Sequence, residues 1–167
     1  MRNLLIACGS GLLLAAGAPA APTELRFGSE PWHLALSLGG LKPTQGVEST
    51  ADRQAWTYSN DKGTILSVIV ENAHAPADKA SCRDVFERRK ADLKPANEVQ
   101  GERGDAATQE YDFQLDFRGK AIVQHNIFSC RVRGTWYIDA HVSKIGYDAA
   151  RDRAALLALL DGVAIVE

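Results

Sequence analysis

The stretch YDFQLDFRGKAIVQHNIFSCRVRGTWYIDAHVSKI, residues 111–145, alternates apolar and polar side chains along three successive segments. Arg118-Gly119 and Arg133-Gly134-Thr135 separate the segments, and each break contains the glycine that tight hairpin turns favour. Alternation with a period of two is typical of strands with one buried and one solvated face. The stretch therefore predicts a three-stranded antiparallel meander with a two-residue turn at the first break and a three-residue loop at the second.

Further strands are expected on both sides of this meander. Trp56–Asn60 and Thr64–Glu71 flank Asp61-Lys62-Gly63, a combination that predicts a hairpin with a glycine-containing turn. His33–Leu38 places leucines at alternate positions, as a strand would. The last four apolar residues, Val163–Val166, either form a short strand or tuck the end of the chain into the core.

Two segments have the apolar period of a helix instead. Residues 78–93 and 149–161 repeat their apolar side chains along one stripe and leave charged side chains on the other side. The expected caps are Asp78 or Ser81 for the first helix, and Asp148 with Gly162 as the C′ residue for the second. Together these patterns predict an α+β fold, a mainly antiparallel sheet with two helices packed on it.

Residues 1–20 have the layout of a secretory signal peptide. They contain one charged side chain, Arg2, followed by an apolar run and by Ala18-Pro19-Ala20. Cleavage is expected after Ala20 or Ala21, which leaves a single domain over residues 21–167. The apolar run is shorter than the ~20 residues that span a bilayer, so no stable membrane insertion is expected. We therefore expect a bacterial protein secreted into the periplasm.

A lipoprotein signal is the alternative interpretation of the same segment. Leu5-Ile6-Ala7-Cys8 resembles a lipobox, whose cysteine becomes lipidated. Few apolar residues precede Cys8, and the apolar run continues beyond it. These two features favour an ordinary signal peptide.

Composition excludes several classes of function. The chain has 167 residues, 46% of them hydrophobic and 24% charged, which is close to the average for one globular domain. Its 19 Lys and Arg residues against 21 Asp and Glu residues provide no net positive field for a phosphate backbone. We therefore expect no nucleic-acid partner.

Cys82 and Cys130 are the two cysteines that remain once the leader is removed. Each lies on the expected core side of its element, so a helix resting on the sheet brings them within the ~5.5–6 Å Cα separation that a disulfide needs. An oxidising compartment favours the bond. We expect a disulfide, and two buried free thiols are the alternative; no Cys-x-x-Cys motif indicates a redox-active pair.

Polar side chains on the outer face of the meander form one candidate site. With the turns predicted above, Asp112 lies opposite His125, His125 lies near Ser143, and Ile127 lies near His141. That face then gathers Glu110, Asp112, His125, Asp139 and His141. Such a group can bind zinc or transfer protons, so a small hydrolase or a metal-binding protein using the His125/His141 face is one hypothesis.

The simpler interpretation is a solvated strand face, because alternating strands place polar residues outward whatever their function. No nucleophile, phosphate-binding or metal-ligand motif occurs in the sequence. We expect no enzyme, no catalytic residue, no metal and no cofactor.

The order of elements resembles a known family. A Trp-containing strand after Pro31, a hairpin, a helix, a meander ending in Gly134-Thr135-Trp136-Tyr137-Ile138 and a leucine-rich closing helix are similar to the PsbP-like α/β/α sandwich. Members of that family include bacterial periplasmic and secretion-associated accessory proteins. The resemblance implies a binding or accessory role and names no ligand, and the Cys82/Cys130 pair is not typical of the family.

The favoured hypothesis is thus an exported, non-enzymatic binding or accessory protein that acts through contacts with another protein. An immunity protein that neutralises a toxin delivered to the periplasm is the alternative, since a small, mildly acidic, disulfide-bonded domain suits that task. The polar segments Gly39–Gln54 and Lys94–Ala107 are expected to be loops, where binding residues often lie.

Overall fold

The computed structural model describes residues 21–44, 48–90 and 94–167, so the leader expected at residues 1–20 and the site of Cys8 lie outside the described residues. Within the described part of the chain, no helix is long and apolar enough to cross a membrane.

The predicted meander is confirmed. Its strands are β8 (Ala106–Phe117), β9 (Lys120–Arg133) and β10 (Trp136–Ile145), paired antiparallel in that order. The first turn has two residues, Arg118 and Gly119, with φ of 54° and 74°. Two positive φ angles match the right-handed twist of the strands they join.

The second turn is one residue shorter than predicted. Arg133 pairs directly with Trp136, so Gly134-Thr135 alone makes the turn. This shifts the register by one residue: His125 lies opposite Lys144 rather than Ser143, and His141 lies opposite Phe128. Because side chains alternate between the faces of a sheet, a one-residue shift moves every side chain of β10 to the other face relative to β9.

The meander is the centre of an eight-stranded sheet of order β3-β5-β6-β10-β9-β8-β7, with β4 also paired to β5. The predicted hairpin is confirmed as β5 and β6. The strands outside the meander are β3 (Lys42–Pro43), β4 (Glu48–Ser49), β5 (Arg53–Ser59), β6 (Thr64–Asn72) and β7 (Ala96–Arg103).

The prediction of a loop over Lys94–Ala107 was wrong, because β7 occupies most of that segment. This strand forms an edge of the sheet and most of its residues are exposed, Val99 at 60%. A strand that is solvated on both faces has no alternation of apolar and polar residues, so its sequence resembles that of a polar loop.

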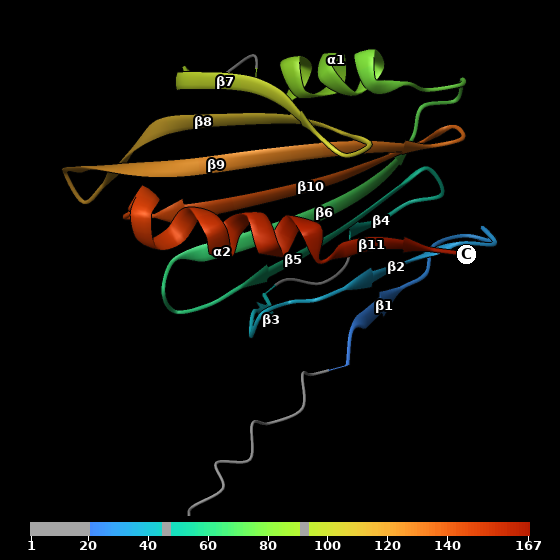
Figure 1. Cartoon of the computed structure of the whole chain (residues 1–167), viewed down its shortest axis with the longest axis horizontal. Helices are drawn as coiled ribbons and strands as arrows, with labels where there is room; N and C mark the ends of the chain where they lie inside the picture. Colours follow the sequence, from blue (N-terminus) through green and yellow to red (C-terminus); the bar gives the residue numbers. More distant parts are fainter. Residues whose placement is uncertain (1–20, 45–47, 91–93) are drawn as a thin grey trace, which may run out of the picture.

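Two layers cover the faces of this sheet (Figure 1). Helix α1 (Lys79–Arg89) packs on β8 and β9. On the opposite face lie helix α2 (Ala149–Asp161) and a three-stranded sheet, and β11 continues from the end of α2 to pair with β2. That small sheet contains β1 (Thr23–Leu25), β2 (His33–Leu36) and β11 (Val163–Val166). The predicted α+β class is confirmed.

Local capping explains where both helices begin. Asp78 accepts a 2.8 Å hydrogen bond from the Ser81 amide, and the Ser81 hydroxyl accepts one of 2.9 Å from the Asp78 amide. Both predicted capping residues therefore act together as a capping box. Asp148 likewise accepts from the amide of Arg151.

Gly162 ends α2 for a different reason than predicted. Its φ is −71°, so it does not adopt the left-handed conformation expected of a C′ glycine. A Cβ at this position would lie 2.9 Å from the carbonyl oxygen of Ser37. Glycine is needed here because the end of α2 closely approaches the end of β2.

The expected disulfide is present. Cys82 and Cys130 are fully buried, their Cα atoms are 5.8 Å apart, and their bond joins α1 to β9. Around it, the rings of Phe86 and Phe128 pack with centroids 4.6 Å apart. The disulfide therefore holds α1 onto its face of the sheet.

Removal of this bond is expected to destabilise the fold. The two cysteines are 48 residues apart, and closing a loop of that length is worth at most about 4 kcal/mol in the unfolded chain. Urea unfolding of the double variant Cys82→Ala/Cys130→Ala should show a loss of about 2–4 kcal/mol. Dithiothreitol should lower the stability of the wild type and leave the double variant unchanged; equal stability of all four samples would contradict the expectation.

Candidate functional site

The structure divides the five candidate polar residues between the two faces of the large sheet. Asp112 lies opposite His125, as predicted, and Glu110 and Asp112 share the α2 face with His125. Asp139 and His141 point to the α1 face, together with Phe128 and Cys130. A common His125/His141 face was therefore an incorrect expectation, and the one-residue register shift at Gly134-Thr135 is its cause.

On the α2 face, His125 joins neighbouring elements. Its Nδ1 lies 2.7 Å from Asp112 Oδ1 and its Nε2 lies 3.5 Å from Glu110 Oε1. The ring of Tyr147 stacks on it with centroids 3.8 Å apart, and Arg153 of α2 donates two hydrogen bonds to Glu110. These contacts attach α2 to β8 and β9. Among the described residues, no group of three His, Cys, Asp or Glu side chains could hold a metal ion.

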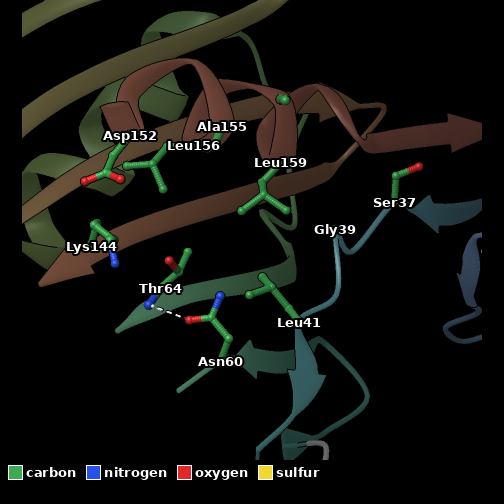
Figure 2. Close-up of a pocket in the computed structure, with 11 residues that line it drawn as sticks. Ser37, Gly39, Leu41, Asn60, Thr64, Lys144, Asp152, Ala155, Leu156 and Leu159 are labelled. Atoms are coloured by element: carbon green, nitrogen blue, oxygen red, sulfur yellow. Dashed lines mark hydrogen bonds between the residues drawn. The ribbon is translucent and has the colours of Figure 1, made fainter. Parts of the chain in front are cut away.

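A hollow of about 440 Å³ lies between α2, the ends of β6 and β10, and the segment that follows β2. We call it the α2 hollow. In Figure 2, Leu156 and Leu159 extend from α2 toward the side that carries Leu41 and Asn60. Its lining is mainly apolar, and its volume lies within the range of ordinary ligand sites, about 300–1,000 Å³.

Polar groups line one end of the α2 hollow. Asn60 Oδ1 accepts a 3.1 Å hydrogen bond from the amide of Thr64, and Lys144 and Asp152 lie nearby (Figure 2). Hydrogen bonds from the Arg151 side chain and then from the Asp148 amide hold the pKa of Asp152 far below its usual range. Asp152 therefore stays ionised at physiological pH.

A second hollow, of about 260 Å³, lies on the opposite face beside the end of α1. We call it the α1 hollow. It is lined by Ser67, Ile69, Phe86, Arg89, Lys90, Tyr111, Phe128, Asp139 and His141.

Asp139 is the most deeply buried charged group of the α1 hollow, at 1% exposure. Arg89 donates to Asp139 Oδ2 and, over 2.8 Å, to Glu71 Oε2. The other carboxylate oxygen, Oδ1, has no hydrogen-bond partner within the described part of the chain. Burial of an unpaired carboxylate oxygen is costly, so this atom stands out among the polar atoms of the residues that line the hollow.

His141 is a neutral acceptor in the same hollow. Asn126 donates its Nδ2 to the Gln124 carbonyl over 2.9 Å, which directs its Oδ1 toward His141 Nε2, 3.0 Å away. The proton of the imidazole is therefore assigned to Nε2, which leaves Nδ1 as an acceptor. Burial, with a smaller contribution from Arg89, lowers the pKa of His141 to about 4.

Sequence patterns alone missed both hollows. The lining of the α2 hollow comes from segments as far apart as Ser37 and Leu159, and that of the α1 hollow from α1 and four strands. The alternation that places Asp139 and His141 on one face was visible, but a strand pattern does not reveal which face is buried.

Acidification is expected to destabilise the protein through His141. Its pKa falls from 6.5 to about 4 on folding, so the unfolded state binds more protons between these values and stability declines as the pH falls through that window. The loss should reach at most about 3 kcal/mol. Between pH 7 and pH 5, urea unfolding should show a smaller loss of stability for His141→Gln than for the wild type. The exposed His74→Gln is the control and should lose as much stability as the wild type; equal losses in all three proteins would contradict the expectation.

Arg89 should be far more important for stability than its neighbour Arg88. Arg89→Met leaves Asp139 buried without its cation, so we expect a loss of about 2–3 kcal/mol in urea unfolding. The exposed Arg88→Met should change stability by less than about 0.5 kcal/mol. The double variant Arg89→Met/Asp139→Leu should recover much of the loss, because no buried charge remains. Equal effects of the two single variants would contradict the assignment.

Comparison with known proteins identifies no family. No family model matches the chain, and no curated protein matches it. Among solved structures, LpqN, described as involved in cell envelope biogenesis of Mycobacterium tuberculosis, is similar at 13% sequence identity and a TM-score of 0.40, over 91% of this chain and 88% of that one. A likeness at this level carries no argument about function.

Proposed function

We propose that the protein is an exported periplasmic accessory protein, without catalytic activity, that binds a partner protein by receiving an apolar side chain in the α2 hollow. The observation that carries this proposal is the hollow itself, about 440 Å³ of mainly apolar lining beside a helix held onto the sheet. A concave apolar surface with a few polar groups at one end is the usual form of a binding site.

The disulfide supports export. Bonds of this kind form and persist in oxidising compartments and are rare where thiols are kept reduced. The Cys82–Cys130 bond, together with the signal-peptide layout of residues 1–20, is consistent with a periplasmic location.

The chemistry of the α2 hollow favours a protein partner. Leu41, Leu156 and Leu159 suit a buried apolar side chain, while the polar end with Asn60 and Lys144 suits the hydrogen-bonding groups of a peptide. Buried apolar anchors in pockets dominate the affinity of many protein interfaces. The partner therefore contributes an exposed apolar residue with polar neighbours.

The two histidines support a non-enzymatic role. His125 lies between Asp112 and Glu110 and attaches α2 to the sheet, while His141 is a neutral group on the opposite face. The order of elements in the sequence resembles the PsbP-like family, and we extend the accessory role of that family to this protein as part of the proposal.

Site-specific photo-crosslinking in cells tests this function. A benzophenone side chain at position 158, which lines the α2 hollow, should form a defined protein adduct on irradiation. The same group at position 154, exposed on α2 but outside the lining, is the matched control and should form none. Adding Ala155→Trp, which fills the hollow, should abolish the adduct.

Three results would overturn the proposal: equal adducts from positions 154 and 158, adducts with lipid alone, or recovery of the protein in the cytoplasmic fraction with both thiols free. If the crosslinked partner is a secreted toxin, the protein is an immunity protein that neutralises it.

A further inference from the structure

We propose that the α1 hollow binds a small organic cation through its primary ammonium group, with Asp139 Oδ1 as the principal acceptor. This inference is independent of the proposed function, which uses the hollow on the opposite face of the sheet.

One carboxylate oxygen of Asp139 has no hydrogen-bond partner among the described residues. Asp139 is 1% exposed and lines the hollow, and its Oδ1 has no partner among the residues that the structure describes. Arg89 donates to the other oxygen and to Glu71. A ligand that donates an N–H to Oδ1 removes the cost of burying an unpaired charged atom.

Further acceptors surround the same space. His141 lies two positions after Asp139 on β10 and therefore on the same face, with Nδ1 free of a proton. Ser67 lies directly opposite His141 on β6 and also lines the hollow. An ammonium group has three N–H donors and no acceptor, which matches a carboxylate, an imidazole nitrogen and a hydroxyl.

Aromatic rings form another wall of the hollow. The rings of Phe86 and Tyr111 lie with centroids 5.4 Å apart, and Phe128 packs against Phe86. Lys90 Nζ already lies 5.1 Å from the centroid of the Phe86 ring. This wall therefore attracts an ammonium group, as the faces of aromatic rings generally do.

The ion pairs already present favour a cation over an anion. Arg89 and Lys90 are the two cations of the hollow, and each is already paired with two carboxylates: Asp139 and Glu71 for Arg89, Glu87 and Glu98 for Lys90. His141 adds no charge near neutral pH. An anion would therefore meet no cation of the hollow that lacks a carboxylate partner, whereas a cation would find Asp139 Oδ1 without a donor among the described residues.

The volume limits the size of the ligand. About 260 Å³ is below the roughly 300–1,000 Å³ typical of drug-sized sites, so an amine with a short carbon chain fits. The ammonium can come from a free amine or from the end of a lysine side chain, since the chemistry is the same.

Nuclear magnetic resonance titration of the disulfide-bonded mature protein tests the proposal. We expect n-butylammonium chloride to shift the methyl signals of Ile69 and the ring signals of His141 in a saturable manner. Tetramethylammonium chloride, which has no N–H, and sodium butyrate should produce no saturable shift at the same ionic strength. Nα-acetyl-lysinamide serves as the second arm: equal shifts identify a lysine side chain as a source, and their absence restricts the site to free amines.

Variants locate the site. Asp139→Asn keeps the shape of the side chain and should weaken n-butylammonium binding by at least about tenfold. Ser67→Leu fills the hollow and should abolish binding even if Asp139→Asn fails to fold. Thr57→Leu is the matched control, since Thr57 pairs with Ser67 on the neighbouring strand outside the hollow and should leave binding unchanged.

The proposal is overturned if n-butylammonium produces no saturable shift, if butyrate or tetramethylammonium binds equally well, or if Ser67→Leu binds like the wild type.

Discussion

The rest of the structure depends on how the two apolar faces of the large sheet are covered. The large sheet has eight strands and buries apolar side chains on both faces. Among the residues that the structure describes, two helices of 11 and 13 residues and one small sheet cover it. Apolar surface must be removed from water, so each cover rests on the most apolar part of its face. Both hollows lie beside a helix, one at the end of α1 and the other along the side of α2.

Specific bonds keep these covers in place. On one face, the Cys82–Cys130 disulfide and the contact of Arg89 with Asp139 attach both halves of α1. On the other face, Arg153 bonds to Glu110, and Arg131 donates a 2.7 Å hydrogen bond to the carbonyl of Val163 just after α2. Because the helices are fixed at several points, the walls of both hollows are part of the folded structure. A preformed site of this kind binds without the cost of ordering its walls.

Local patterns in the sequence were sufficient for the meander strands, the hairpin at Asp61-Lys62-Gly63, the N-caps of both helices and the cysteine pair, since each depends on neighbouring residues or on one face of one element. They failed at Gly134-Thr135, where one residue of turn length decides which face carries His141. They also failed at β7, whose two solvated faces leave no alternation. The burial of Asp139 could not be predicted, because it depends on Arg89, 50 residues away on α1.

The central claim is that one rigid sheet carries two separate binding hollows, one on each face. Methyl nuclear magnetic resonance with two probes tests it directly: an apolar fluorescent dye, 1-anilino-8-naphthalenesulfonate, for the α2 hollow and n-butylammonium for the α1 hollow. We expect the dye to shift the methyl signals of Leu156 and Leu159 and the amine to shift those of Ile69, and each probe should bind equally well in the presence of the other. Shifts of the same methyl groups by both probes, or competition between them, would contradict it.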